Sequence, residues 1–288
     1  MRWLVSSWRA LRRLETMLLA LDVGNTHIHG GVFEGDTLRM QFRRSTHPIG
    51  SSDEIGLFLR AVLRENGLDP LESIAAVGIC SVVPQMVYPL RSACVKYFRC
   101  EPFVLQPGVR TGLKIKYRNP LEVGADRIAN AVAAAQLWPG RDAIVIDIGT
   151  ATTFDVITAG RDYLGGVILP GPSISVEALA GKTARLPTVE IARPEAVLGR
   201  STVESIQSGV FYGQAGAIRQ LVELLSREAF AGVRPLVIGT GGFSRMYERE
   251  GLFDEIVPDL VLRGLLLAER LNREESAAKG RGRPESTA

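Results

Sequence analysis

The stretch Met17-Leu-Leu-Ala-Leu-Asp-Val-Gly-Asn-Thr26 decides the fold of this 288-residue chain, because Ala143-Ile-Val-Ile-Asp-Ile-Gly-Thr150 repeats its pattern. Each is a continuous apolar run that ends in Asp-x-Gly, which is typical of a strand buried on both faces and followed by a tight turn. Asp22 and Asp147 align without a gap at an offset of 125 residues, and a glycine follows each of them 13 positions later. An offset of that size predicts duplicated domains rather than short repeats. Two such strand–turn–strand units facing each other would leave a cleft between them.

The rest of the chain alternates between strand and helix patterns, which predicts the α/β class. Apolar runs bounded by turn residues predict strands over Met17–Val23, Ile28–Glu34, Thr37–Phe42, Ile74–Ser81, Ala143–Asp147, Thr152–Thr158, Tyr163–Leu169 and Leu236–Ile238. Helical periodicity and helix-end signals predict helices over Ser52–Asn66, Pro84–Phe98, Pro120–Trp138, Ser175–Lys182, Thr202–Glu228 and Asp259–Asn272. Pro139-Gly140 marks the boundary between the halves. We therefore expect an extension at 1–16, domains at 17–140 and 141–272, and a disordered polar tail at 273–288.

The charge distribution argues against a nucleic-acid surface on the folded part. The formal net charge is +3, but residues 1–16 hold four arginines against one glutamate, and residues 273–288 hold four basic against three acidic residues. The remaining chain therefore has a net charge of −1. Because the basic character comes from the ends, nucleic acid is an unlikely partner of the core.

The cysteines and the hydropathy pattern indicate a cytoplasmic protein. There are three cysteines, Cys80, Cys94 and Cys100, with no CxxC pair. An odd number without a paired spacing argues against a disulfide framework and against a zinc site. No apolar run approaches the roughly 20 residues that span a bilayer, so we expect no membrane partner. Residues 1–16 lack the sustained apolar region of a signal peptide, and Met17 would serve as a start.

The two Asp-x-Gly turns have the chemistry of a phosphate site. Glycine permits a tight turn and a close approach of phosphate to backbone amides, while the carboxylate suits Mg²⁺ bound through water. Polar donors stand in both turns: Asn25, Thr26, Thr150, Thr152 and Thr153. One Asp-x-Gly is common in ordinary turns, but two in register favour a phosphate grip. Gly239-Thr-Gly-Gly242 adds a third glycine-rich turn, which could lie against a nucleotide or could simply connect a strand to a helix. Neither a Walker A motif nor a strand-linked GxGxxG is present.

A third carboxylate stands in Asn119-Pro-Leu-Glu-Val-Gly-Ala-Asp-Arg127, which opens an Ala-rich helix pattern. Asp126 near a helix start could be the base that an acceptor hydroxyl requires, and Arg127 could hold a substrate carboxylate. Equally, Asp126 could be a helix-start residue stabilised by the helix dipole, with Arg127 as a surface ion pair. Local sequence leaves both readings open.

Taken together, these motifs resemble the type III pantothenate kinases. The resemblance rests on Leu21–Thr26, the Tyr117–Arg127 stretch, Asp147–Thr152, Gly165–Gly171 and Gly181–Pro187, in order, and it runs from about Met17 to Asn272. It implies the acetate/sugar kinase–Hsp70–actin fold, in which two duplicated ribonuclease-H-like domains enclose a cleft, as in actin-like ATPases. It also implies ATP-dependent phosphorylation of pantothenate to 4'-phosphopantothenate, the first step of coenzyme A biosynthesis. The implied cofactors are Mg²⁺ with ATP and a monovalent cation, K⁺ or NH₄⁺, and the implied assembly is a homodimer.

The resemblance also implies roles for individual residues. Asp126 would be the catalytic base. Asp147 would bind the monovalent cation, and Asp22 would bind Mg²⁺ through water. The residues expected to bind ATP are Asp22, Val23, Gly24, Asn25, Thr26, His27, Ile28, His29 and Thr150. The residues expected to bind pantothenate are Tyr117, Gly124, Ala125, Asp126, Arg127 and Thr183.

The chain departs from the family pattern in two places. His27 stands where the family commonly has Asn, with His29 close by, so phosphate affinity could differ; both could also be plain strand residues. Residues 1–16 have no counterpart in the usual pattern. Two alternative functions stay open: a non-catalytic accessory factor in transcription, as some relatives are described, and a kinase of the same fold for another small molecule.

Overall fold

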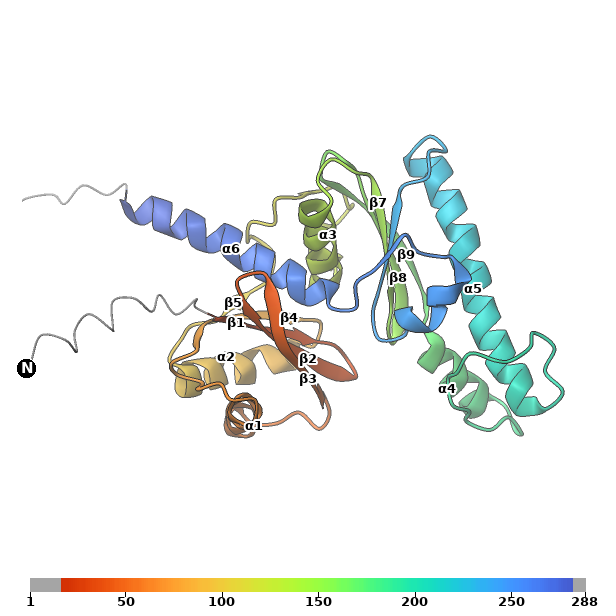
Figure 1. Ribbon diagram of the computed structural model, residues 1–288, viewed down its shortest axis with the longest axis horizontal. Helices are drawn as coiled ribbons and strands as arrows, with labels where there is room; N and C mark the ends of the chain where they lie inside the picture. The colour runs from red at the N-terminus through yellow and green to blue at the C-terminus, as the bar shows by residue number, and fades with distance from the viewer. Residues whose placement is uncertain (1–16, 282–288) are drawn as a thin grey trace, which may run out of the picture. The chain divides into compact units, whose positions relative to one another are not determined.

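The computed structural model describes residues 17–281 and shows two compact units, each built around one β-sheet (Figure 1). Of the described residues, the first unit takes 17–110, 124–129 and 265–281, and the second takes 111–123 and 130–264. The predicted extension at 1–16 and the residues 282–288 lie outside the described part. The domain bounds at 17–140 and 141–272 and the cleft between the domains stay predictions.

The first unit holds a five-stranded sheet of order β3-β2-β1-β4-β5. Its strands are β1 (Met17–Val23), β2 (His27–Glu34), β3 (Thr37–Ser45), β4 (Ile74–Ser81) and β5 (Phe103–Val104). Strands β1, β2 and β3 form an antiparallel meander, and β4 runs parallel to β1 on its other side. Helices α1 (Ser52–Glu65) and α2 (Pro84–Phe98) connect these strands.

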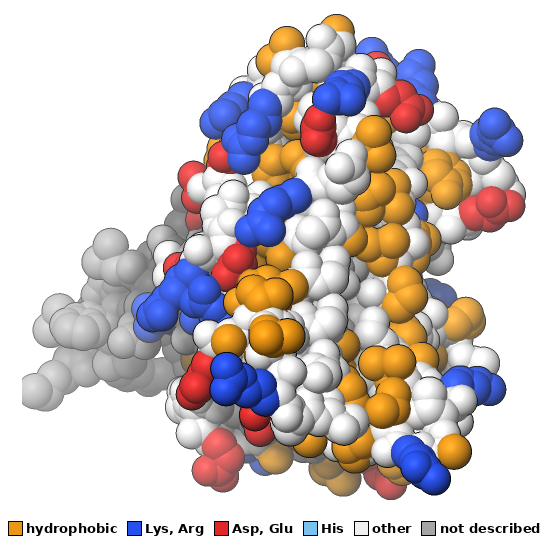
Figure 2. Space-filling view, turned by 90° about the vertical axis from the view of Figure 1, so that its right-hand side faces the viewer, with side chains coloured by type: hydrophobic (Ala, Val, Ile, Leu, Met, Phe, Trp, Pro, Cys, Tyr) orange, Lys and Arg blue, Asp and Glu red, His pale blue; other side chains and the backbone are white. Residues whose placement is uncertain are grey.

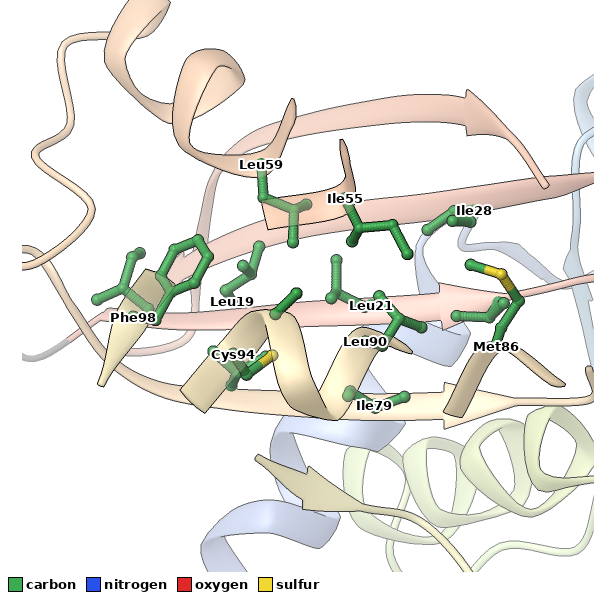
Figure 3. Close-up of a cluster of buried hydrophobic side chains, with 14 of the residues drawn as sticks. Leu19, Leu21, Ile28, Ile55, Leu59, Ile79, Met86, Leu90, Cys94 and Phe98 are labelled. Carbon is green, nitrogen blue, oxygen red and sulfur yellow. The ribbon is translucent and has the colours of Figure 1, made fainter. Parts of the chain in front are cut away.

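Apolar side chains from both helices and the sheet form the core of the first unit (Figure 3). Leu19 and Leu21 of β1 meet Ile55 and Leu59 of α1 in this cluster, and all four are buried. Burying each such side chain contributes about 1.5–3 kcal/mol. The sequence also sets where α1 begins, because the Ser51 hydroxyl accepts from the Glu54 amide while the Glu54 carboxylate accepts from the Ser51 amide. The core and the cap together hold β1 in the middle of the sheet, so that its carboxyl end is fixed.

The second unit holds a six-stranded sheet of order β11-β10-β7-β8-β9-β6. Its strands are β6 (Lys114–Ile115), β7 (Ala143–Ile148), β8 (Ala151–Ile157), β9 (Asp162–Pro170), β10 (Leu236–Thr240) and β11 (Glu255–Ile256). The remaining helical elements of the described residues are, in chain order, η1 (Pro120–Glu122), α3 (Ala125–Leu137), α4 (Pro172–Lys182), α5 (Thr202–Ala229), η2 (Ser244–Glu250) and α6 (Leu260–Arg281).

The second sheet is covered on both faces, as its continuous apolar strands predict. Ile144, Ile146 and Ile148 of β7 pack in a cluster with α5 and η2, whereas Ala143 and Val145 pack in a second cluster with the alanines of α3. This alternation follows from the two-residue period of a strand. Strand β7 is therefore buried along its length, and the chain emerges only at its end.

The duplication inferred from the sequence is present in the sheets. The order and directions of β3-β2-β1-β4-β5 recur as β9-β8-β7-β10-β11, and β6 is added at the outer edge of β9. Strands β3 and β9 begin and end at positions that differ by the same 125 residues. The α/β prediction with two duplicated ribonuclease-H-like halves is confirmed.

Two differences from the predicted elements concern the start of α3 and the end of the last helix. The helix predicted from Pro120 is wrong at its start: Pro120–Glu122 form the 3₁₀ helix η1, Val123 is extended, and α3 begins at Ala125. The last helix continues to Arg281, past the predicted tail start at Arg273, since the intervening residues are good helix formers. No helix in the described residues combines the length and the apolar character required to cross a membrane.

Candidate active site

The first Asp-x-Gly turn leaves the sheet of the first unit between β1 and β2. Asp22 lies opposite His29 of β2 and Cys80 of β4. The Gly24 amide donates to the His27 carbonyl at 3.0 Å, so the chain reverses over Asn25 and Thr26. Both of these residues and His27 are exposed, whereas Val23 and Ile28 are buried in the core. The proposed ATP loop is thus an exposed tip on a buried base, and Val23 and Ile28 support it from within the core.

Asp126 lies in the first turn of α3, as the sequence predicted for a helix start. Its Oδ1 accepts a hydrogen bond from the Arg127 amide at 2.8 Å. Burial raises the pKa of this carboxyl, and the hydrogen bond and charge of Arg127 oppose the rise. The Gly124 backbone packs closely against this carboxylate, because a Cβ at Gly124 would lie 2.5 Å from Asp126 Oδ1. A carboxylate whose pKa is raised by burial is a stronger base than an exposed one.

The structure places the end of β1 and the start of α3 beside the same residue: the Val82 amide donates to the Val23 carbonyl at 3.1 Å, and a Cβ at Gly124 would lie 3.7 Å from Val82. Cys80 is fully buried, and its pKa is raised well above the usual value first by burial and then by the negative charges of Asp22 and Asp126. All three residues belong to the first unit. The carboxylates of Asp22 and Asp126 are therefore both close enough to Cys80 for their negative charges to act on it.

The second Asp-x-Gly turn is tighter than the first. Asp147 ends β7 opposite Thr153 of β8 and Thr240 of β10. The Gly149 amide donates to the Ala151 carbonyl at 2.9 Å, so only Thr150 stands at the tip, and Thr150 is exposed. The two turns match in sequence but differ in their hydrogen bond: the Gly24 amide donates to the carbonyl three residues later, whereas the Gly149 amide donates to the carbonyl two residues later.

Two glycines from other elements pack directly against this second turn. A Cβ at Gly171 would lie 2.3 Å from the Gly149 oxygen and 2.4 Å from the Thr150 oxygen. A Cβ at Gly241 would lie 2.3 Å from Asp147 Oδ1, and the φ of +87° at Gly241 also favours glycine. Gly239–Gly242 therefore does more than connect a strand to a helix: its third residue lies against the Asp147 carboxylate.

Asn130 is a partner of Asp147 that local sequence reasoning missed. Its Nδ2 donates to Asp147 Oδ2 at 3.1 Å, and its side chain is 1% exposed. Its Oδ1 is buried without a hydrogen-bond partner. The only local signal was its place four residues after Asp126 in an Ala-rich helix, where a buried amide is unusual. A second missed residue, Thr46, lies beside the first turn.

Tyr117 and Thr183, two of the expected substrate contacts, both lie in the second unit. The ring of Tyr117 is 6.4 Å from that of Tyr163, whose hydroxyl donates to the buried Asp155 at 2.7 Å. The Thr183 hydroxyl donates to the Leu179 carbonyl at 2.7 Å at the end of α4. Thr183 also lines a groove of about 1260 Å³ beside α4 and α5. Gly124, Ala125 and Arg127 lie instead with Asp126 in the first unit, and Arg127 is 7% exposed.

The residues present fit the two implied cations in different ways. Among the described side chains, those of residues 17–274, no three His, Cys, Asp or Glu gather as a metal site. Asp22 is the carboxylate that would reach an ATP-bound Mg²⁺ through water. At Asp147 the donor set is a carboxylate beside the unsatisfied Asn130 Oδ1. Oxygen donors of this kind suit a hard cation such as K⁺.

Comparison with known proteins shows which family this chain resembles. A family model described as type III pantothenate kinase matches residues 18–224. The type III pantothenate kinase of Legionella pneumophila (strain Corby) is 57% identical over 256 residues, and that of Elusimicrobium minutum (strain Pei191) is 46% identical over 257 residues. Both alignments cover 89% of this chain and 99% of the relative.

Two solved structures match at the level of fold alone. A protein described as a Baf family transcriptional activator from Campylobacter jejuni has a TM-score of 0.56 at 20% identity, covering 89% of this chain and 99% of that one. A reductive activator for a corrinoid, iron-sulfur protein has a TM-score of 0.52 at 11% identity, covering 93% of this chain and 62% of that one.

The duplicated sheets, each with an aspartate at the end of its first strand, place this chain in the actin-like ATPase fold class. Within that class, the family match over most of the chain and relatives at 57% and 46% identity decide the assignment. The chain belongs to the type III pantothenate kinase family. Kinases of this kind use ATP with a divalent metal.

Proposed function

We propose that this chain transfers the γ-phosphoryl group of ATP to pantothenate and so catalyses the first step of coenzyme A biosynthesis. The observation that carries the proposal is Asp126, a carboxylate with a raised pKa in the same unit as the phosphate loop of Asp22. Its position in the chain falls within the segment matched to the family. The reaction also requires little covalent chemistry from the protein, since phosphoryl transfer depends mostly on positioning and charge stabilisation.

The first loop binds the phosphates in this proposal. Asn25, Thr26 and His27 are exposed at its tip and offer backbone and side-chain donors, and Thr150 contributes from the second turn. Asp22 would orient the water ligands of an ATP-bound Mg²⁺, whose positive charge would offset that of the phosphates. His29 lies in β2 opposite Asp22, and its ring is hydrogen-bonded to the side chain of Gln41 at 3.1 Å. It is the last residue of the proposed ATP loop.

Asp126 accepts the proton of the pantothenate hydroxyl as that oxygen attacks the γ-phosphorus. Arg127, directly after it in α3, binds the pantothenate carboxylate, with Gly124 and Ala125 giving the substrate close access to the backbone. Tyr117 and Thr183 complete the pantothenate contacts. The close packing of the Tyr117 ring supports its role, because a Cβ at Gly165 would lie 3.2 Å from that ring.

Asp147 holds the monovalent cation. The support is its oxygen-rich surrounding, in which Asn130 fixes one carboxylate oxygen and the Gly241 backbone lies against the other. A bound K⁺ or NH₄⁺ would add positive charge near the turn that carries Thr150. That charge favours the anionic nucleotide.

The assembly we propose is a homodimer through the groove beside α4 and α5. Exposed apolar side chains lie in or near it, among them Ile168 (61% exposed), Ile174 and Leu179. Figure 2 looks onto the side of the molecule that carries α5 and shows a band of apolar side chains there. Apolar areas of this kind mark interaction sites. Light scattering of the purified chain would show a single subunit mass if the dimer proposal is wrong.

The cytoplasm is the proposed location. All three cysteines are free, with Cys80 and Cys94 buried, which fits a reducing compartment.

The test is a substrate panel with purified full-length protein. ATP, Mg²⁺ and pantothenate are supplied with and without K⁺, and the phosphorylated product is identified by mass spectrometry. Other small acids and alcohols are tested in parallel, because a kinase of the same fold could act on one of them. Absence of phosphopantothenate under all cation conditions would sink the proposal.

A further inference from the structure

Thr46 makes two hydrogen bonds to the first phosphate loop. It directly follows β3 and is fully buried. Its backbone amide donates to the Thr26 carbonyl at 3.0 Å, and its hydroxyl donates to the Gly24 carbonyl at 2.7 Å. Burying the Thr46 hydroxyl removes its hydrogen bonds to water, and only a good hydrogen bond within the protein offsets that loss.

The duplicated half of the molecule provides an internal comparison. The residue 125 positions later is Gly171, which directly follows β9 in the same way that Thr46 follows β3. The Gly171 amide donates to the Thr150 carbonyl at 3.1 Å, whereas the counterpart of Thr26 is Ala151, so a similar backbone bond is made one residue earlier in the second turn. The side chains differ: at Gly171 even a Cβ would lie 2.3 Å from the Gly149 oxygen, the counterpart of the Gly24 oxygen. The first loop is therefore closed by a hydroxyl, where the second is closed by direct backbone packing.

The hydroxyl matters because Gly24 has no side chain to hold its own peptide in place. A glycine peptide rotates with little steric resistance. If the Gly24 carbonyl turned outward, its partial negative charge would face the phosphates, and repulsion would weaken their binding. The Thr46 hydroxyl binds this oxygen on the buried side, so that the loop presents donors at its exposed tip.

We propose that Thr46 is a positioning residue of the phosphate loop, which keeps the Gly24 carbonyl turned away from the nucleotide. This inference rests on the proposed role of Asp22–His29 in binding ATP. It assigns Thr46 no contact with the substrates. Its effect is on the affinity for ATP and not on the recognition of pantothenate.

The test compares Thr46→Val, which keeps the shape and removes the hydroxyl, with Thr46→Ser, which keeps the hydroxyl. We expect the KM for ATP to rise about three- to tenfold in Thr46→Val, the range of one hydrogen bond. The KM for pantothenate should stay unchanged, and Thr46→Ser should restore the KM for ATP to within about twofold of the original. Calorimetric titration with ATP alone should show the same loss of affinity.

A matched control separates positioning from mere stability. Thr158→Val makes the same change in the second unit, where the Thr158 hydroxyl accepts from the Asp162 amide at 3.1 Å. It should lower the melting temperature without changing the KM for ATP. If Thr46→Val behaves like this control, or if Thr46→Ser is as impaired as Thr46→Val, the inference is wrong. Should Thr46→Val fail to fold, Thr46→Ala removes the same hydroxyl without adding a methyl group, and an unchanged affinity for ATP in that variant overturns the inference. The original protein binding ATP without phosphorylating pantothenate would refute the substrate proposal and leave this test intact.

Discussion

Gly171→Ala adds one methyl group against the turn that carries Asp147. The φ of −75° and ψ of 174° at Gly171 suit any residue, so the substitution changes the space and not the backbone preference. The new Cβ would lie 2.3 Å from the Gly149 oxygen and 2.4 Å from the Thr150 oxygen. Even a close C···O contact is about 3.3 Å. The turn or the start of α4 must therefore move by about 1 Å.

That displacement has two expected costs. Overpacking of this kind costs about 1–3 kcal/mol, which lowers the melting temperature of a chain of this size by about 2–12 °C. The moving atoms belong to the turn of Asp147 and Thr150, and a misplacement of about 1 Å in a catalytic site costs on the order of a hundredfold in rate. We expect both losses in the same variant.

Thermal unfolding and initial rates at saturating ATP and pantothenate measure the two effects. Gly216→Ala is the matched control, because nothing lies within 4 Å of a Cβ at that position in α5. Alanine there should raise stability by up to about 1 kcal/mol and leave the rate unchanged. A Gly171→Ala protein with the original melting temperature and rate would refute the close packing of the turn.

Three further predictions concern the carboxylates. Asp126→Asn should lower kcat by about 10²–10⁴-fold, as for loss of a general base, and a normal rate would remove Asp126 from that role. Because the raised pKa means that burial disfavours the charged carboxylate, the melting temperature of this variant at neutral pH should equal or exceed the original, and the gain should shrink as the pH falls. In the original enzyme, kcat should fall about tenfold per pH unit below the raised pKa of Asp126, an acid limb above the usual range of aspartate; a rate flat down to the range of an ordinary aspartate would contradict this. Asn130→Ala removes the 3.1 Å bond to Asp147 and should raise the K⁺ concentration for half-activation about two- to tenfold. K⁺ should also raise the melting temperature of this variant less than that of the original protein. If K⁺ titrations by rate and by melting temperature are both unchanged, Asn130 does not act through the cation.

The long strands were predictable because their information is local. β1 and β7 are unbroken apolar runs that end in turn residues, and the gapless offset between Asp22 and Asp147 continues through β3 and β9. The two-residue strands were missed: β5, β6 and β11 exist only because a neighbouring strand pairs with them. Pairing across the sheet leaves no pattern in a segment that short.

The start of α3 shows where local signals conflict. Asn119-Pro120 is a sound helix opening, and the structure uses it: the Asn119 side chain accepts from the Leu121 amide. The chain then makes only one 3₁₀ turn, because Val123 becomes extended ahead of Gly124. The α-helix starts afresh at Ala125, and this second start sets Asp126 in the first turn of α3.

The candidate site divides in the same way. The three aspartates were predictable because each stands at the end of a strand or the start of a helix, where the local pattern is clear. Thr46 and Asn130 were not, since each acts on a carbonyl or carboxylate 22 or 17 residues away in sequence. Such partners emerge only when the sheet has brought the segments together. For Thr46, the register with Gly171 was a signal in the sequence that a comparison of the two halves would have found.

The two Asp-x-Gly turns differ because different contacts close them. The first reverses over two exposed residues, and a buried hydroxyl draws its carbonyl inward, so the tip is rich in donors and suits an anion. The second reverses over Thr150 alone, and Gly171 and Gly241 bring backbone so close that the carboxylate of Asp147 and the carbonyl oxygens of the turn are crowded together. Crowded oxygens repel an anion and attract a cation. Under the proposed function, one duplicated element binds phosphate in one half and a cation in the other, and we infer that the difference depends on whether the residue after the third strand carries a side chain.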